Sequence, residues 1–318
     1  MERENILSKT KKWSILAPLC VISAGILWGI IGLFSNYLAA AGFSSIQITF
    51  LRCLVTSVSL LLFSLVFDRD LLKIRLKDIW MFIGTGVFSI AFFNISYFTC
   101  ISHSTLSVAC TLLYTGPCFV MIISCFIFKE KFTLKKGVSL AGAVAGCAFI
   151  TGLIGGAHGV SITPFAFATG LCAGLGYGLY SIFGSIALKK YQPLTVTIYT
   201  FSIAALALVP ICDIPNIIDL SLESSSSSSV ILFIVMLGII STLLPFALYT
   251  MGLSHMETSR ASMLTFIEPV CAALISIFVF HEPFGINHAI GMIAIIGSVS
   301  ILNINFKGRK QYHTDLNS

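Results

Sequence analysis

The sequence predicts an all-α integral membrane protein with ten transmembrane helices, arranged as two inverted five-helix repeats. Its composition is the first observation behind this fold class. Of the 318 residues, 57% are apolar and only 10% are charged, and the mean hydropathy is +0.97. Soluble domains carry about 25% charged residues. The hydrocarbon of a bilayer must therefore take the place of a water-excluding core.

An internal duplication is the second observation. Residues 86–132 and 238–284 align without a gap at an offset of 152 residues, and fifteen of the 47 positions are identical. Apolar composition alone would not bring Tyr97/Tyr249 and Pro117/Pro269 into one frame, so the chain is a repeat. We expect a first five-helix repeat at 1–155, a second at 160–306 and a cytoplasmic tail at 307–318.

Ten stretches reach the length of about 20 apolar residues that a helix needs to cross a membrane. They are residues 14–38, 44–67, 79–101, 105–128, 136–154, 163–188, 194–212, 230–253, 260–280 and 285–305. The longest segment between them, 213–229, ends in six serines, which is typical of a flexible linker.

The distribution of Lys and Arg is the third observation. Eighteen of these 19 residues fall in the N-terminal segment, the even-numbered loops and the C-terminal tail, and the nineteenth, Arg52, lies within a span. Short basic loops face the cytoplasm, so we expect a multi-pass protein of the cell membrane with both termini cytoplasmic. Because each repeat holds an odd number of helices, the second must be inverted. In agreement, the lysines at 129, 131, 135 and 136 become His281, Pro283, Asn287 and His288.

Inverted repeats are typical of secondary transporters, which bind their substrate near the bilayer midplane between the halves. We therefore expect transport of a small molecule by alternating access, with membrane lipid as the other partner. The basic residues lie in short loops between apolar stretches, which argues against nucleic-acid binding. No GxxxxGK[ST] motif is present, so ATP is not expected to drive transport directly. No cofactor or metal is expected, since the ten cysteines lie almost wholly in apolar stretches as small hydrophobic residues.

Several motifs resemble those of one transporter family. They are Ala24-Gly25-Ile26-Leu27-Trp28-Gly29, Phe50-Leu51-Arg52, Phe128-Lys129-Glu130-Lys131-Phe132, Phe266-Ile267-Glu268-Pro269 and Phe280-His281-Glu282-Pro283-Phe284. With them the chain resembles the drug/metabolite transporter (DMT) superfamily, and within it the EamA-type ten-helix transporters. The resemblance implies export of small metabolites, commonly amino acids or related compounds, without ATP.

Two charged residues within the spans are candidates for substrate binding or coupling. Glu268 and Arg52 each lie eight residues into a span, which corresponds to a depth of about 12 Å at 1.5 Å per residue. Charged residues inside a membrane are costly and are functional candidates by default. Neither has a charged mate in the other repeat, since Gly116 aligns with Glu268. The alternative is a structural pair, and the sequence does not say whether the two meet.

Polar and aromatic residues near the middle of other spans are candidates for lining a cavity, although each alone is more typical of packing. They are Trp28, Asn94, Tyr97, Tyr114, Tyr177, Tyr180 and Tyr249. Pro117 and Pro269 are expected to kink the fourth and ninth helices, because proline removes a backbone donor. Glu130 and Glu282, at loop edges, are expected to be helix-entry or loop-bonding residues rather than coupling sites.

Rival functions remain open at this point. An uptake carrier or a drug-efflux carrier would use the same scaffold. An intramembrane enzyme is not favoured, because the sequence has no HExxH, no GxSxG and no paired intramembrane Asp. A receptor is not favoured either, because no sizeable soluble domain is expected. Substrate, direction, proton coupling, and a monomeric or homodimeric state are not determined by the sequence.

Overall fold

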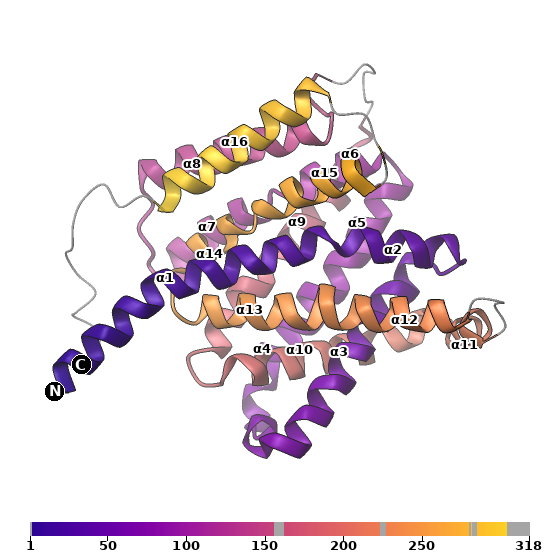
Figure 1. Ribbon diagram of the computed structural model, residues 1–318, viewed down its shortest axis with the longest axis horizontal. Coiled ribbons are helices and arrows are strands. Elements are labelled where there is room, and N and C mark those ends of the chain that lie inside the picture. The colour runs from indigo at the N-terminus through magenta and orange to yellow at the C-terminus, as the bar shows by residue number, and fades with distance from the viewer. Residues whose placement is uncertain (1, 156–161, 223–226, 280, 282–284, 304–318) are drawn as a thin grey trace.

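A computed structural model gives the arrangement of the chain and describes residues 2–155, 162–222, 227–279, 281 and 285–303. The described residues are helical with short connections (Figure 1). The first half contains α1 (Glu2–Gly29), α2 (Ile31–Ala40), α3 (Ser45–Phe67), α4 (Ile79–Ile83), α5 (Phe92–Ser102), α6 (Leu106–Leu113), α7 (Gly116–Ile127) and α8 (Leu134–Ile150). The second contains α9 (Pro164–Ala187), α10 (Pro193–Leu208), α11 (Ile214–Leu222), α12 (Ser227–Gly238), α13 (Leu244–Leu253), α14 (Thr258–Leu264), α15 (Ile267–Val279) and α16 (Ile286–Asn303).

Helix boundaries recur at the offset of the sequence duplication. α5, α6 and α8 begin at residues 92, 106 and 134, and α13, α14 and α16 begin 152 residues later, at 244, 258 and 286. Two π-helical segments also correspond, because Gly84–Ala91 precedes α5 and Ile239–Leu243 precedes α13. The two halves therefore share their breaks and irregular turns as well as their sequence motifs.

Eight helical stretches among the described residues are long and apolar enough to cross a membrane, where the sequence predicted ten. The difference concerns the fifth and tenth predicted spans. They correspond to α8, with 17 residues and two lysines in its first turn, and to α16, with 18 residues. At 1.5 Å per residue these helices are about 26–27 Å long, slightly less than a bilayer core of about 30 Å.

The expected linker at 213–229 is also partly helical. Ile214–Leu222 forms α11, and α12 begins at Ser227. α11 contacts α3, since the Gln47 side chain donates to the Asn216 side chain at 2.9 Å. Residues 223–226, which include the first three serines, lie outside the described residues.

Corresponding helices of the two halves contact each other in antiparallel fashion. α8 lies beside α16 (Figure 1), with Gly142 against Ser298 and Gly146 against Gly291. A Cβ atom on Gly146 would lie 2.8 Å from the Gly291 carbonyl oxygen, so glycine is required for this approach. α3 and α10 are also antiparallel to each other, because the hydroxyls of Ser57 and Ser202 are 2.7 Å apart and Leu60 clusters with Ile198.

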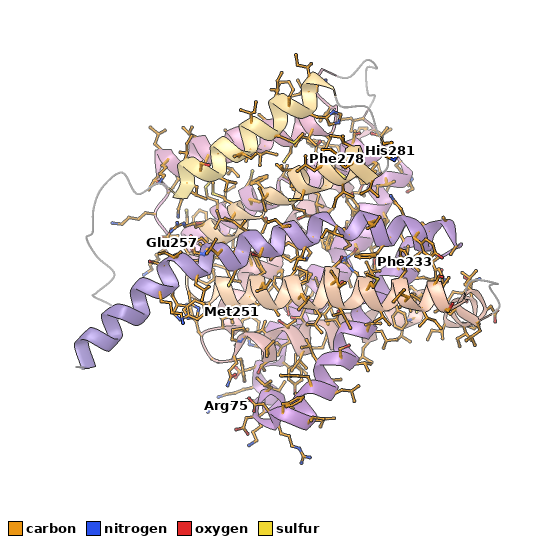
Figure 2. All side chains as sticks on the ribbon, in the orientation of Figure 1. Arg75, Phe233, Met251, Glu257, Phe278 and His281 are labelled. Carbon is orange, nitrogen blue, oxygen red and sulfur yellow. The ribbon has the colours of Figure 1, made fainter. Side chains whose placement is uncertain are left out.

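The two ends of the bundle can be told apart by labelled residues. Figure 2 shows Glu257 towards the end at which α1 begins, and His281 towards the opposite end. At the first end Trp13 of α1 stacks on His255, with ring centroids 3.7 Å apart. We call this the N-terminal end.

Candidate functional site

The site is built around two interrupted helices, one in each half. α6 ends at Leu113 and α7 begins at Gly116, while α14 ends at Leu264 and α15 begins at Ile267. Both interruptions fall immediately before the prolines that the sequence predicted as kinks. Pro117 and Pro269 lie in the first turn of α7 and α15, where a missing backbone N–H costs little. Each of these two spans therefore contains a short turn directly before its proline.

Glu268 occupies the first turn of α15, directly after the interruption. Its backbone N–H donates to the Thr265 carbonyl at 2.9 Å, and its half-buried carboxylate accepts a hydrogen bond from the Tyr177 hydroxyl at 3.2 Å. The amides of a helix N-terminus favour a negative charge there. The sequence thus places its one deep carboxylate where the backbone stabilises it.

Tyr177 of α9 lies against both interruptions. Its hydroxyl reaches Glu268, and its ring packs on Gly116, where an added Cβ would lie 2.9 Å from Tyr177 Cδ1. Gly116 and Glu268 are repeat mates, so one side chain contacts the same point of both halves. Gly178 follows it, and a Cβ there would lie 2.9 Å from the Gly116 carbonyl oxygen.

α1 packs closely against the start of α15 through two glycines. A Cβ on Gly29 would lie 3.0 Å from the Glu268 carbonyl oxygen and 2.6 Å from Cys271 Cβ. Gly25 lies against Ile267 in the same way. Their spacing of four residues is typical of glycines that let two membrane helices approach closely.

Arg52 lies on α3, with 7% of its surface exposed. Its Nη2 donates to Asn94 Oδ1 at 3.5 Å, and that oxygen also accepts from Thr49 at 3.2 Å. Asn94 is held by its own Nδ2, which donates to the Ile90 carbonyl of the π-helical segment at 2.7 Å. Arg52 Nε has no hydrogen-bond partner. The guanidinium is therefore buried with weak compensation, which is costly for a cation.

Arg52 and Glu268 are near each other without pairing. Their charges are close enough to interact, but the ion pairs among the described residues include none between them within 4.0 Å. α5 connects the two, because Asn94 contacts Arg52 while Phe93 packs edge-on against Tyr177 at 5.9 Å.

The predicted aromatic residues fall into two groups. Tyr97, Tyr114 and Tyr177 lie near enough to Glu268 for an electrostatic interaction with its carboxylate. Tyr97 also contacts the Cys110 sulfur at 2.9 Å, and Tyr114 packs on Phe266 at 6.1 Å.

The second group is formed by Trp28, Tyr180 and Tyr249. Trp28 lies 5.4 Å from the ring of Tyr249, whose hydroxyl bonds to Ser181 at 2.6 Å, and the Tyr180 hydroxyl bonds to Thr250 at 2.8 Å. The tyrosine hydroxyls are thus satisfied within the protein, whereas Trp28 Nε1 is buried without a partner. The repeat mates Tyr97 and Tyr249 therefore have different surroundings.

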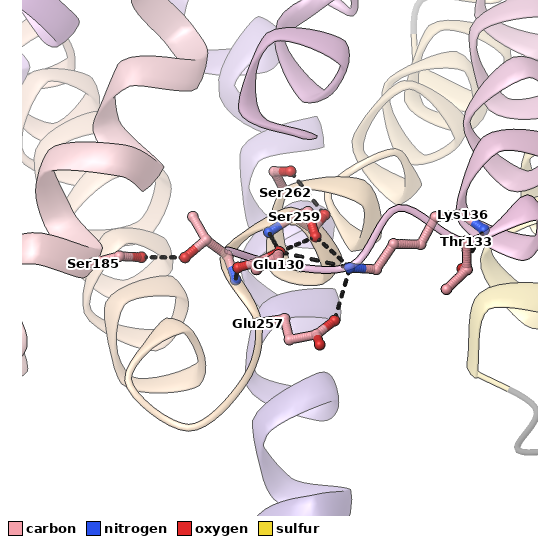
Figure 3. A network of polar contacts seen from close by, with 8 residues as sticks. Glu130, Thr133, Lys136, Ser185, Glu257, Ser259 and Ser262 are labelled. Atoms are coloured by element: carbon pink, nitrogen blue, oxygen red, sulfur yellow. Dashed lines mark hydrogen bonds and ion pairs between the residues drawn. The ribbon is translucent and has the colours of Figure 1, made fainter. Parts of the chain in front are cut away.

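A polar network at the N-terminal end joins the two halves (Figure 3). The Glu130 carboxylate accepts from the backbone N–H groups of Thr258 at 2.7 Å and Ser259 at 3.2 Å, and from the Ser259 hydroxyl. Glu130, expected to be a helix-entry or loop-bonding residue, thus caps the start of α14. Lys136, which the sequence marked only as one of the lysines of a basic loop, places its ammonium 2.8 Å from Glu257 Oε2. Glu282, the repeat mate of Glu130, lies outside the described residues.

Comparisons with known proteins agree on a family. The EamA-like transporter family matches residues 15–152 and, a second time, residues 164–304. A protein of Archaeoglobus fulgidus named an uncharacterized transporter is 28% identical over 282 residues, which is 86% of this chain and 92% of the relative. The uncharacterized inner membrane transporter YicL of Salmonella typhimurium is 24% identical over 302 residues, 92% of this chain and 96% of the relative.

The fold has a counterpart among solved structures. One, titled "Crystal structure of protein", superimposes with a TM-score of 0.72 at 18% identity, covering 90% of this chain and 95% of that chain. At this identity the likeness concerns the fold alone.

Proposed function

The chain belongs to the EamA-like transporter family, and we propose that it is a secondary transporter that exports amino acids or related compounds across the cell membrane. The observation that carries this proposal is the meeting of two interrupted helices at Tyr177, with a carboxylate at the start of one of them. Secondary transporters hold charged substrates and ions at such helix interruptions near the bilayer midplane.

We further propose that the two halves form inverted repeats of five helices each, with α8 and α16 as the fifth and tenth membrane helices. The antiparallel contacts between corresponding helices support this arrangement. Alternating access follows from it, because two equivalent halves can exchange the conformations that open each side in turn. The positive-inside distribution of lysine and arginine supports cytoplasmic termini, with export then running away from the N-terminal end.

Glu268 and Arg52 are assigned to the substrate. Arg52 is buried with its Nε unsatisfied among the described residues, and the half-buried Glu268 carboxylate does not pair with it, so neither has an opposite charge in direct contact. An amino acid would compensate both, with its ammonium at Glu268 and its carboxylate at Arg52. In this arrangement Tyr177 orients the Glu268 carboxylate, and Asn94 orients Arg52. When no ammonium is bound, a proton on Glu268 would remove the negative charge that the ammonium otherwise compensates, which provides for proton coupling.

A competition assay tests the substrate class. Protein reconstituted in proteoliposomes takes up labelled leucine or phenylalanine by counterflow, in the presence of unlabelled amino acid, its methyl ester or its decarboxylated amine. We expect the zwitterion to compete and the two analogues to compete about 10- to 100-fold more weakly, because each leaves Arg52 without its anion. In Arg52→Gln the zwitterion should lose this advantage. Equal competition by all three compounds in the wild type would contradict carboxylate recognition.

A further inference from the structure

We propose that Glu130 and Lys136 form, with Glu257 and the start of α14, a gate that closes the N-terminal end of the transport path and must open in each cycle. This proposal rests on the alternating-access function proposed above. In a carrier of that kind, Glu130 and Lys136 would take a direct part in the transport cycle, although they lie on other elements than Glu268 and Arg52.

The first argument is that the network joins the two halves. Glu130 lies in the connection from α7 to α8 and Lys136 in the first turn of α8, whereas Glu257, Thr258 and Ser259 form the start of α14. Glu130 accepts from the first two backbone amides of α14, which lack partners within their own helix. The carboxylate also lies at the positive end of that helix. A loop of one half thus caps a helix of the other.

The second argument is the burial of the charges. The side chains of Lys136 and Glu130 are only 9% and 8% exposed. The Lys136 ammonium lies 2.8 Å from Glu257 Oε2, 2.8 Å from Ser259 Oγ and 3.6 Å from Glu130 Oε2. Removing one partner of a buried ion pair leaves the other charge uncompensated. The contact is therefore strong when closed and is disrupted by loss of a single side chain.

The third argument is position. α14 is the first part of the interrupted helix that carries Glu268, so the network holds the outer end of that helix. Ser185 of α9 joins through Thr258 at 2.7 Å, and α9 also carries Tyr177. The gate thus holds the two helices that contact the candidate substrate site. Separation of the halves at this end requires the network to break.

The fourth argument is an asymmetry between the repeats. At the opposite end the positions of Lys136 and Glu257 are taken by His288 and Thr105, so neither the lysine nor the second acid recurs. The backbone corner before the glutamate is the same in both halves, because Lys129 and His281 have φ angles of 54° and 56°. Such left-handed positions are strained for residues other than glycine and persist where the surrounding structure fixes them. The corner is shared by both halves, whereas the lysine at 136 and the acid at 257 each belong to one half.

Cysteine labelling tests the gate without any substrate. On a background that lacks the ten native cysteines, Ser262→Cys reports on α14, where Ser262 is 3% exposed and donates to Ser259 O at 2.9 Å. An impermeant maleimide is applied from the side that exposes an N-terminal tag. We expect Lys136→Met to raise the labelling rate about tenfold or more, because a buried pair is broken. Lys73→Met is the matched control, since Lys73 makes an exposed ion pair with Asp70.

Two further variants keep the outcome decisive. If Lys136→Met does not yield folded protein, Glu257→Gln removes the acid and leaves the Glu130 cap on α14 in place. A second reporter, Thr111→Cys, lies in the other half of the repeat, at the position that corresponds to Met263, the neighbour of Ser262. It reports on the other end and should label no faster in the gate variants. Folded variants that label at the wild-type rate, or that label faster at both reporters, would overturn the proposal. An absence of amino-acid transport would leave this result unaffected, so the two proposals fail separately.

Discussion

Tyr177 is the side chain at which the two halves meet, and its neighbours show how the repeat has diverged. Gly116 and Glu268 align in the duplication, and both lie against Tyr177. One half supplies space at this point and the other supplies a carboxylate. A charge that occurs in only one half of a duplicated fold is expected to serve binding, because the other half forms the same helices without it.

The Tyr177 hydroxyl should matter more for transport than the Tyr180 hydroxyl does. Tyr177→Phe removes a donor to a carboxylate, an interaction of about 1.5–3 kcal/mol, so we expect transport to fall by about 10- to 150-fold. Tyr180→Phe is a matched control one turn along α9, because its hydroxyl bonds to Thr250 at 2.8 Å instead. Reconstituted transport and the midpoint of thermal unfolding measure both. A larger transport loss in Tyr180→Phe would contradict the assignment.

At this scale the sequence identified the residues but not their partners. Counting along the spans gave Arg52 and Glu268 similar depths, but the ion pairs among the described residues include none between them. Depth does not determine which way a helix is rotated, so it could not show that Arg52 bonds to Asn94 or that Glu268 bonds to Tyr177. For the same reason it could not show that the hydroxyls of Tyr180 and Tyr249 bond to Thr250 and Ser181.

At the scale of the elements, the interrupted helices are the main feature. A proline in a continuous helix bends it, but here each helix ends and begins again within a few residues. The turns before Pro117 and Pro269 are closed by local hydrogen bonds, because the hydroxyls of Thr115 and Thr265 donate to the carbonyls of Leu112 and Ser262.

Replacement of Pro269 should affect transport more than folding. In Pro269→Ala the restored backbone N–H allows α14 and α15 to join across Thr265 and Phe266. We expect transport to fall about 2- to 30-fold, as for other changes in coupling, with expression maintained. Pro193→Ala is the matched control, because Pro193 begins the continuous helix α10. Poor expression with normal transport per molecule would identify Pro269 as purely structural.

Element boundaries were predictable where the repeat fixed them. The starts of α13, α14 and α16 follow from those of α5, α6 and α8 by addition of 152. Helix α11 was not predicted, because the run of serines that follows it led us to expect a flexible linker over the whole segment 213–229. The contact of Lys136 with Glu257 joins residues 121 positions apart, and no local pattern in the sequence could indicate it.

At the scale of the whole molecule, the two halves are held together by unequal contacts. α8 and α16 meet through glycines, and the N-terminal end is joined by the charged network of Glu130 and Lys136. Arg52 and Glu268, which we propose bind the substrate, lie on α3 and α15. A rocking motion of one half against the other would expose them to one side at a time, which is the movement that alternating access requires.

Counterflow with Glu268 variants tests the central claim most directly. Wild-type protein, Glu268→Gln and Glu268→Asp are reconstituted in vesicles preloaded with amino acid, and entry of the labelled compound is followed with and without a proton gradient. Asp70→Asn, a change at an exposed acid, is the control. We predict exchange by the wild type and the control, reduced exchange by Glu268→Asp, and none by a folded Glu268→Gln, because the amide cannot bind an ammonium or release a proton. Exchange by Glu268→Gln at the wild-type rate would contradict the account.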